Sequence, residues 1–292
     1  MNPFSTSYTA DTTDYELIQK TLEGDKKAVD DLLRKHQPYI YNIAWKMVQN
    51  PVDAADLAQE AMIKIITNLS KFNHKSTFRT WAYRIVVNHF LNDQHKRGNE
   101  QFLSSFEEMS HALDTIPDHD MSEMEQQESK ALIREMNLSC MSGMLLCLNR
   151  EQRLVYIIGE MLGGDHTIGS DILQISKDNF RAKLRKARKD LYNFMNDKCG
   201  LINKNNPCRC HKKVKVAVEN QVIDVKHLLF NRKEFDRFKS QIREDADFMF
   251  DDIDKKYAEL YQDMSFKTDF DKKSFISSVI EDTNWKSKLK LN

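Results

Sequence analysis

The stretch from Phe72 to Arg97, FNHKSTFRTWAYRIVVNHFLNDQHKR, combines aromatic, amide and cationic side chains. At spacings of 3, 4, 4 and 3 residues, one helical face would carry Trp81, Arg84, Asn88, Asn92 and His95. Cations bind phosphates, amides read base edges and rings stack on unpaired bases, so such a face suits nucleic acid. A solvated helix face beside core aromatics would give the same pattern. The neighbouring segments must decide between the two interpretations.

A second basic helix is expected after Ser176, a residue type that commonly caps helix N-termini. Its outer face would carry Lys177, Arg181, Arg185 and Arg188, and its inner face Phe180, Leu184, Ala187 and Leu191. A short apolar helix and a turn at Gln174 precede it. The pattern predicts a helix-turn-helix with a second helix sized for the DNA major groove. We favour DNA binding over a merely solvated basic surface.

A Cys-rich segment follows this helix. Its candidate metal ligands are Cys199, Cys208, Cys210 and His211. Four such ligands can close a tetrahedral zinc site. A redox-sensing thiol pair and cysteines without a role are the alternatives. Cys140 and Cys147 lie among apolar residues and are expected in the core.

The helices around the first stretch must position it. A helix from Asp53 would bury one stripe, made of Ala54, Leu57, Ala58, Ala61, Met62, Ile65 and Leu69. Its other face would expose Asp53, Asp56, Glu60, Ile63 and Thr67. Acids early in a helix complement its dipole, but Glu60 beside Ile63 is more typical of a partner-binding surface. Within Phe72–Arg97, a short polar loop would run into a helix that buries Phe78, Ala82, Ile85, Val86 and His89 or Phe90.

The rest of the chain reads as helices and connections. Pro38 is expected to open a new helix. Residues 100–128 contain nine acids and neither Lys nor Arg, which predicts a solvated linker or an acidic strand for a partner's basic channel. KVKVAVENQVIDV, from Lys213, alternates like a strand or hairpin. Charged helices with aromatic anchors would complete the C-terminal part.

Composition narrows the class of protein. The 292 residues hold 44 Lys and Arg against 44 Asp and Glu, so any nucleic-acid surface must be local. Only 8 Gly and 5 Pro favour an all-helical fold. Neither a membrane-spanning run nor a signal peptide is recognisable, which predicts a cytoplasmic protein without membrane insertion. Five unevenly placed cysteines do not form a secreted disulfide framework.

Two blocks together resemble a known family. DAADLAQEAMIKIITNL with FNHKSTFRTWAYRIVVNHFLND is similar to the second conserved region of bacterial sigma factors of the extracytoplasmic-function (ECF) class. LNREQRLVYIIGEMLGG with IGSDILQISKDNFRAKLRKARKDL resembles the fourth region of that class. The resemblance covers about residues 14 to 195 and implies a non-enzymatic factor that directs core RNA polymerase to promoters and helps to open them. Some of these factors also carry a Cys-rich extension.

The resemblance implies a role for each block. Polymerase binding would fall to Asp53, Asp56, Gln59, Glu60 and Ile63. The −10 element would be held by Phe72, Lys75, Ser76, Phe78, Arg79, Trp81, Arg84 and Asn88, with a base captured by the loop from Phe72 to Phe78. The −35 element would be read by Lys177, Asn179, Arg181, Arg185 and Arg188. The acidic linker would follow the polymerase toward its RNA exit path.

The implied fold is all-α. It consists of two helical sigma domains, the second with the helix-turn-helix, joined by the acidic linker and followed by a small, mostly helical extension. The expected segments are a disordered terminus (1–13), the region 2 domain (14–98), the linker (99–130), the region 4 domain (131–197), the Cys-rich segment (198–213) and the extension (214–292). No cofactor is required by such a factor, although a structural zinc ion is the candidate for the Cys-rich segment. Core RNA polymerase and promoter DNA are the implied partners, and an anti-sigma factor is a further one that the resemblance allows.

Some positions depart from the family pattern. Asn73, His74 and Lys75 replace a basic residue, Gly and an acid in the base-capturing loop. Gln174 stands where a turn Gly is usual, and Gly169 where Ala is usual. Asn149 replaces a common Pro. Two other functions stay open: a stand-alone helix-turn-helix regulator of transcription, and a helical interaction protein that binds acidic partners.

Overall fold

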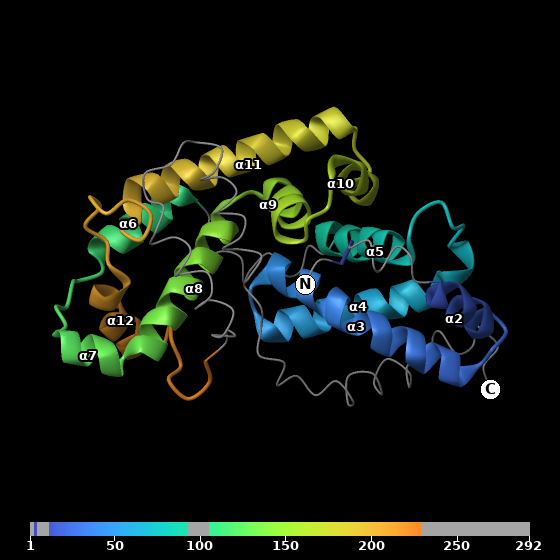
Figure 1. Ribbon diagram of the computed structural model, residues 1–292, viewed down its shortest axis with the longest axis horizontal. Coiled ribbons are helices and arrows are strands. Elements are labelled where there is room, and N and C mark those ends of the chain that lie inside the picture. Colours follow the sequence, from blue (N-terminus) through green and yellow to red (C-terminus); the bar gives the residue numbers. More distant parts are fainter. Residues whose placement is uncertain (1–2, 5–11, 93–104, 229–292) are drawn as a thin grey trace. The chain divides into compact units, whose positions relative to one another are not determined.

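The computed structural model of the protein describes residues 3–4, 12–92 and 105–228. The first helices are α2 (Thr13–Leu22), α3 (Lys26–Val48), α4 (Pro51–Thr67), the 3-10 turn η1 (Leu69–Lys71) and α5 (Phe78–Asn92). The later ones are α6 (Phe106–Thr115), α7 (Glu123–Glu128), α8 (Lys130–Cys147), α9 (Arg150–Tyr156), the π-helix η3 (Ile157–Met161), α10 (His166–Leu173), α11 (Lys177–Lys198) and α12 (Cys210–Glu219) (Figure 1). This described part is all-α, with no strand, as the sequence predicts.

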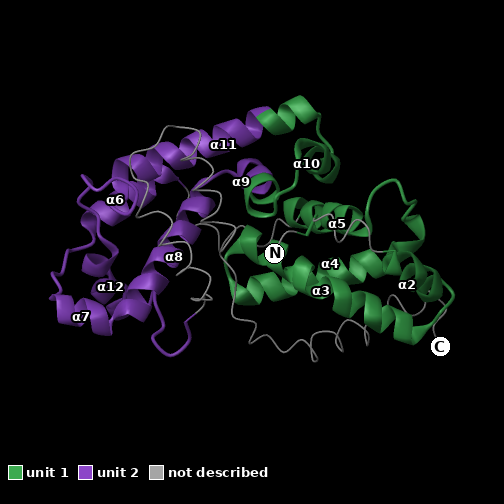
Figure 2. Ribbon diagram, in the orientation of Figure 1, with its two compact units in different colours: residues 1–96, 157–181, 268–292 green, residues 97–156, 182–267 purple. Residues whose placement is uncertain are grey.

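The described residues form two compact units (Figure 2). Unit 1 holds the described residues of 1–96 together with 157–181, and unit 2 those of 97–156 and 182–228. The expected segment boundaries differ from this division and stay a prediction. His95, most of the N-terminal segment, the start of the linker and the aromatic anchors beyond residue 228 lie outside the described residues.

In unit 1, α3 packs against both α2 and α4. Each of α3 and α4 begins at a side-chain cap. The Asp25 carboxylate accepts hydrogen bonds from the backbone N–H groups of Lys27 and Ala28. The Asn50 side chain does the same at the start of α4, where Pro51 takes the first helical position without leaving a donor unpaired.

Pro38 does not open a new helix, because it lies inside α3. Proline within a helix removes one hydrogen bond and costs about 3 kcal/mol or more. Here the helix continues because its apolar stripe continues: Leu33 precedes Pro38, Ile40 and Ile43 follow it, and all three apolar side chains are buried. Tertiary burial at roughly 25 cal/mol per Å² offsets the local penalty.

The buried stripe predicted for α4 is confirmed. Ala54, Leu57, Ala58, Ala61, Met62, Ile65 and Leu69 are all buried, and Ile66 joins them. Helical periodicity predicted the buried residues correctly because α4 is amphipathic and packs its apolar face on α3 and α5.

A short turn joins α10 to α11, as the helix-turn-helix prediction requires. Asp165 caps α10 by accepting from the N–H groups of Thr167 and Ile168. The Ser176 hydroxyl accepts from the N–H of Asn179, so the predicted cap of α11 is confirmed. Between the two helices, Gln174 adopts the left-handed conformation, with φ at 54°.

Replacing Gln174 with Gly is expected to stabilise the protein by about 0.5–1 kcal/mol. A left-handed residue with a Cβ costs roughly 1–2 kcal/mol, and the greater entropy of Gly in the unfolded chain cancels part of the gain. Urea unfolding would measure the difference. Gln174→Ala keeps the strain and should give no stabilisation; an equal gain from both variants would contradict the explanation.

Gly169 in α10 is required by the ring of Phe180. A Cβ atom at this position would lie 2.3 Å from two atoms of that ring, and Phe180 is buried. Ala at position 169 would gain about 1 kcal/mol of helix propensity but would overpack a well-filled site, which costs about 1–3 kcal/mol. Gly169, where Ala is usual in the family, therefore leaves room for the ring of Phe180.

We expect Gly169→Ala to destabilise the protein by about 1–2 kcal/mol, because overpacking outweighs the helix-propensity gain. Thermal unfolding would show it. In a double-mutant cycle with Phe180→Leu, the cost of Gly169→Ala should shrink, since the smaller side chain leaves room. Additive effects of the two changes would show that the ring does not set the requirement.

In unit 2, α8 packs against α6, α7 and α12. One cluster consists of Met136, Val214, Ala217 and Ile223, with Cys210 packed against it. The strand expected from Lys213 is therefore wrong. The sequence there forms α12, because Val214, Ala217 and Val218 fall on one helical face that packs on α8.

The acidic segment is partly folded and paired. Within it, α6 and α7 each begin at a serine cap, Ser105 and Ser122. Three of its acids form ion pairs with lysines of unit 2: Asp114 with Lys198 at 2.7 Å, Asp118 with Lys213 at 2.9 Å and Asp120 with Lys212 at 2.9 Å. The lysines hold the pKa values of Asp114 and Asp118 below the ordinary range through hydrogen bonds to the carboxylates. The composition alone predicted a solvated spacer because it does not show these partners.

Across the described parts of the chain, no helix is long and apolar enough to cross a membrane.

Candidate nucleic-acid and partner interfaces

The loop between η1 and α5 rests on an aromatic cluster. Phe72 lies 5.7 Å from Phe78 and 5.4 Å from Trp81, centroid to centroid, and Phe78 lies 5.7 Å from Trp81. Phe72 and Phe78 are buried, whereas Trp81 is half-buried. Two of the predicted −10 residues are thus the loop's anchors, and Trp81 keeps part of its ring at the surface.

The tip of the loop is exposed. Asn73, His74 and Lys75 face solvent, and the Asn73 side chain accepts a hydrogen bond from the N–H of Lys75 at 3.3 Å. The His74 ring stacks on Tyr15 of α2 at 4.9 Å. Thr77 begins α5, since its hydroxyl accepts from the N–H of Thr80. Ser76 and Thr77 are half-buried, so the exposed part of the loop is its tip, between anchored ends.

The α5 face, defined as Trp81, Arg84, Asn88 and Asn92, lies at the surface. Asn88 and Asn92 are exposed, and Trp81 and Arg84 are half-buried. The opposite face is buried as predicted at Phe78, Ala82, Val86, His89 and Phe90, while Ile85 is only half-buried. The helix therefore keeps a polar, partly aromatic line free of the core. Contact of this line with DNA stays a prediction.

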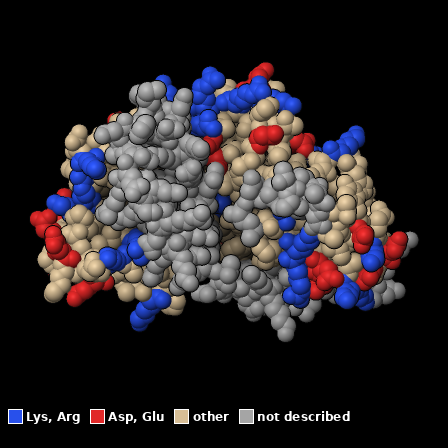
Figure 3. All heavy atoms as spheres, in the orientation of Figure 1, with Lys and Arg blue, Asp and Glu red and all other residues tan. Residues whose placement is uncertain are grey.

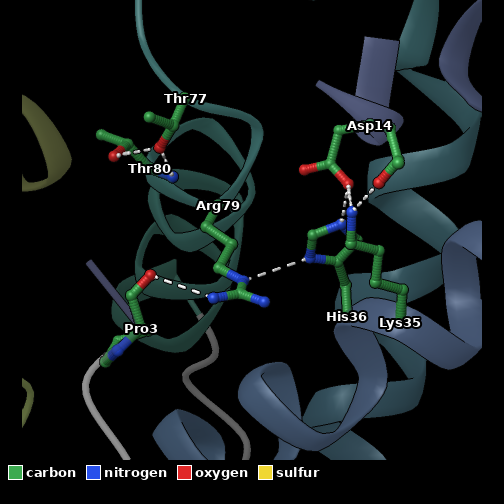
Figure 4. Close-up of polar contacts among 8 residues, drawn as sticks. Pro3, Asp14, Lys35, His36, Thr77, Arg79 and Thr80 are labelled. Carbon is green, nitrogen blue, oxygen red and sulfur yellow. Dashed lines mark hydrogen bonds and ion pairs between the residues drawn. The ribbon is translucent and has the colours of Figure 1, made fainter. Parts of the chain in front are cut away.

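Arg79, expected among the −10 residues, lies in the interior with 5% of its surface exposed. It donates to the Pro3 carbonyl oxygen at 3.1 Å and from Nε to Nδ1 of His36 at 3.4 Å (Figure 4). Its guanidinium also lies 3.4 Å from the ring centroid of Tyr39. These contacts fix the start of α5 against α3, so Arg79 holds the scaffold of the loop.

His36 connects this arginine to a carboxylate. Its Nε2 lies 2.9 Å from Oδ1 of Asp14, which also receives the Lys35 ammonium at 2.7 Å (Figure 4). Burial lowers the pKa of His36, although the Asp14 hydrogen bond opposes the shift. A neutral ring that donates from Nε2 to Asp14 and accepts at Nδ1 from Arg79 satisfies both contacts. The periodicity of the sequence does not reveal this network, because its members lie 22 to 43 residues apart.

The α4 face, defined as Asp53, Asp56, Gln59, Glu60 and Ile63, is exposed or half-buried along its length. Glu60 contacts Nε2 of His89 on α5 at 2.7 Å, and Lys64 contacts Nδ1 of the same ring at 2.6 Å. The face therefore stays at the surface while His89 ties α4 to α5. Polymerase binding by it stays a prediction.

The α11 face, defined as Lys177, Asn179, Arg181, Arg185 and Arg188, is exposed except at Arg188, which is half-buried. Arg181 pairs with Asp178 at 2.9 Å on the same helix. On the side drawn in Figure 3, Lys and Arg side chains gather along part of the upper edge, where Figure 1 draws α11. The inner face is buried at Phe180, Ala187 and Leu191, and half-buried at Leu184.

The structure gives the expected zinc site no support. Among the described residues, no group of three or more His, Cys, Asp or Glu side chains is arranged to hold a metal ion. Cys199 and Cys208 are neighbours through an isolated parallel β-bridge, and Cys210 and His211 open α12. None of the five cysteines, all within the described residues, forms a disulfide, and burial raises the pKa values of Cys199 and Cys208. Of the two cysteines expected in the core, Cys147 is buried and Cys140 is half-buried.

One contact of the α5 face was not foreseen. Arg84 donates from Nη2 to Oδ1 of Asp171 at 2.6 Å and from Nε to the Asp171 carbonyl oxygen at 3.2 Å. Both residues belong to unit 1, in which α10 packs against α5. The sequence offers no signal for this pair, since Asp171 is one acid among many and lies 87 residues away.

Comparisons with known proteins match the sites just described. Residues 32–100, which include α4, the loop and α5, match the family Sigma-70 region 2. RNA polymerase sigma-H factor of Pseudomonas aeruginosa is 28% identical over 175 residues, which cover 60% of this chain and 90% of that protein. ECF RNA polymerase sigma factor SigW of Bacillus subtilis is 31% identical over 88 residues, 30% of this chain and 47% of the relative.

The ECF RNA polymerase sigma-E factor of Escherichia coli strain K12 is 37% identical over 76 residues, 26% of this chain and 39% of the relative. The last two matches thus span less than half of each relative. The sigma-H match covers most of its relative, and the region 2 match includes both the acidic face of α4 and the polar face of α5. The chain belongs to the ECF-type RNA polymerase sigma factors, non-enzymatic DNA-binding factors of transcription initiation.

Proposed function

We propose that this sigma factor binds core RNA polymerase through the α4 face and holds the −10 element with the loop from Phe72 to Phe78 and the α5 face. The −35 element is read by the α11 face. The exposed tip of the loop captures a base of the opened strand, and the half-buried Trp81 stacks beside it. Flipping a base costs a few kcal/mol, which stacking at about 1–3 kcal/mol per base offsets.

One observation carries the proposal. On each of α4 and α5, one side is buried in the same unit while the other keeps a line of polar side chains with one large apolar or aromatic member, Ile63 or Trp81. Such mixed surfaces are typical of partner and single-strand contacts. A stand-alone helix-turn-helix regulator would need only the α11 face and would leave both lines without a use.

The −35 part of the proposal is supported by α10, its short turn and the capped, basic α11. Exposed Arg181 and Arg185 can reach guanine edges or phosphates from a helix in the major groove. Arg79 is left out of the DNA-binding set, because its donors face Pro3 and His36 in the interior.

The test is reconstitution with core polymerase. The full chain should co-purify with the core enzyme, and transcription start mapping after its overproduction should yield one shared promoter pattern. Failure to associate with core polymerase would overturn the proposal. Asp56→Lys and Glu60→Lys, each made singly, should weaken association. Asp31→Lys, which reverses one charge on α3 outside the α4 face, should not.

A further inference from the structure

We propose that Tyr15 of α2 is a positioning residue of the loop from Phe72 to Phe78, and that it sets how strictly this loop discriminates between bases. Its ring holds the ring of His74, and through it the tip of the loop, in one conformation. The inference rests on the proposed function, because it takes this tip to be the part that captures a base. All of these residues belong to unit 1.

The backbone at the tip of the loop needs support. His74 adopts the left-handed conformation, with φ at 59°. Residues with a Cβ atom are strained there, which agrees with the Gly that is usual at this position in the family. The Asn73 side chain closes a turn around His74 by accepting a hydrogen bond from the N–H of Lys75 at 3.3 Å. A strained residue persists where its surroundings hold it, so the contacts of the His74 side chain matter.

Two aromatic rings hold the His74 ring. The Tyr15 ring is stacked on it, with centroids 4.9 Å apart and an interplanar angle of 20°. The Phe72 ring contacts it at a centroid distance of 4.6 Å and an angle of 59°. Phe72 begins the loop, whereas Tyr15 belongs to a different helix. Tyr15 therefore ties the tip to a part of the fold outside the loop, and aromatic stacking offsets some of the backbone strain.

The helix that carries Tyr15 is anchored in the unit. The preceding residue, Asp14, is 5% exposed and receives the Lys35 ammonium at 2.7 Å and Nε2 of His36 at 2.9 Å. One turn further on, Ile18 is buried, and α2 packs against α3 and η1. Tyr15 itself is 48% exposed. The anchors fix the position of α2, so the exposed Tyr15 ring contacts His74 from a fixed support.

A fixed tip affects specificity more than general affinity. Contacts with phosphates hold DNA but carry no sequence information, whereas donors and acceptors placed against the base edge read its identity. One well-placed pair of hydrogen bonds discriminates against the wrong base by about fivefold to 150-fold. A tip that samples several conformations adapts to several bases. Loss of the Tyr15 ring should therefore relax base preference and leave binding to core polymerase and to the −35 element unchanged.

The first readout is the conformation of the tip in the full chain without polymerase or DNA. Histidine is isotope-labelled for NMR, and the ring signals of His74 are assigned by their absence in His74→Gly. Stacking on an aromatic ring shifts these signals, so Tyr15→Ala should move them toward those of an exposed histidine. Tyr15→Phe keeps the ring and should leave them in place. Signals that do not move in Tyr15→Ala would overturn the inference.

The second readout is the base preference of the holoenzyme, the core polymerase that carries this sigma factor. Fluorescein-labelled single strands carry the −10 element of a mapped promoter with all four bases at each position in turn, and anisotropy gives each Kd. At one position, Tyr15→Ala should reduce the ratio of the weakest Kd to the tightest by about threefold to tenfold. Tyr15→Phe should keep this ratio within about twofold. An equal loss at every position would overturn the inference.

Leu22→Ala is the matched control. Leu22 is an exposed apolar residue of α2, two helical turns beyond Tyr15, so its removal takes apolar surface from the same helix. It should change neither the His74 signals nor the base preference. The same changes in Leu22→Ala as in Tyr15→Ala would assign the effect to α2 as a whole and overturn the role of the Tyr15 ring.

A double-mutant cycle separates positioning from direct contact with DNA. In the His74→Gly background, Tyr15→Ala should cause no further loss of base preference, because the ring that Tyr15 holds is gone. The same loss in both backgrounds would mean that Tyr15 itself contacts the strand, and it would overturn the role through His74.

The outcomes also separate the inference from the proposed function. Failure to form the holoenzyme would overturn the proposed function, and a wild-type holoenzyme that binds all the strands equally would overturn base capture by the loop. A wild-type base preference that survives unchanged in Tyr15→Ala would overturn the inference alone.

Discussion

Replacing Arg79 with Met is expected to lower the free energy of unfolding by about 3–5 kcal/mol, the usual cost of removing one partner from a buried charged network. The guanidinium is 5% exposed and contacts the Pro3 carbonyl oxygen, Nδ1 of His36 and the Tyr39 ring. Methionine fills much of the volume but donates no hydrogen bond. Urea unfolding followed by tryptophan fluorescence would measure the loss, since Trp45 and Trp81 lie in unit 1.

Arg34→Met is the matched control. Arg34 pairs with Asp30 on the surface of α3, with half of its side chain exposed, and its removal should leave stability nearly unchanged. A loss of stability in Arg79→Met no larger than in Arg34→Met would contradict the scaffold role. It would then return Arg79 to the set of candidate DNA contacts.

The same network predicts a pH dependence with a definite sign. Burial lowers the pKa of folded His36 below the ordinary 6.5, against the effect of Asp14 and together with Arg79 and Lys35. The unfolded chain therefore binds the proton more readily. Stability should be fully present above about pH 6.5 and should fall as the pH drops below it. In Arg79→Met the loss of stability at low pH should be smaller, because the positive charge of Arg79 no longer lowers the pKa of His36.

Periodicity predicted the helices that bury one clean apolar face. The stripe of α4 and the inner face of α11 were largely confirmed, as were the capping serine at position 176 and the turn before it. Local rules suffice there because each signal lies within a few residues of the structure that it specifies. The same periodic patterns also predicted which residues of α4, α5 and α11 lie at the surface, because these are the residues opposite the buried stripes.

Long-range contacts account for what the sequence did not predict. Pro38 stays inside α3 because burial on both sides of it outweighs a local breaker. The segment after Lys213 is helical because α8 provides a partner for one helical face. The resemblance placed Arg79 among the −10 residues, and the sequence does not reveal its interior contacts with His36 and Pro3. Asp171 gave no signal at all, since only the fold brings it to Arg84.

Replacing Trp81 with Leu is expected to slow promoter opening by about fivefold to a hundredfold, the range that corresponds to a stacking energy of about 1–3 kcal/mol per base. Leu keeps an apolar side chain against Phe72 and Phe78, which lie 5.4 and 5.7 Å from the Trp81 ring, but removes the aromatic surface. A fluorescent base analogue in the −10 element of a mapped promoter would report opening by the polymerase that carries this sigma factor.

Trp81→Phe keeps a ring and should retain most of the opening rate, whereas Arg185→Ala on α11 should weaken binding to the duplex and leave the opening step of bound complexes unchanged. The separation has a physical basis, because Trp81 is half-buried beside a loop for unpaired bases and Arg185 is exposed on a helix sized for the major groove. If Trp81→Leu and Arg185→Ala lowered duplex binding equally and neither slowed opening, both surfaces would be duplex contacts and the loop would have no part in strand capture.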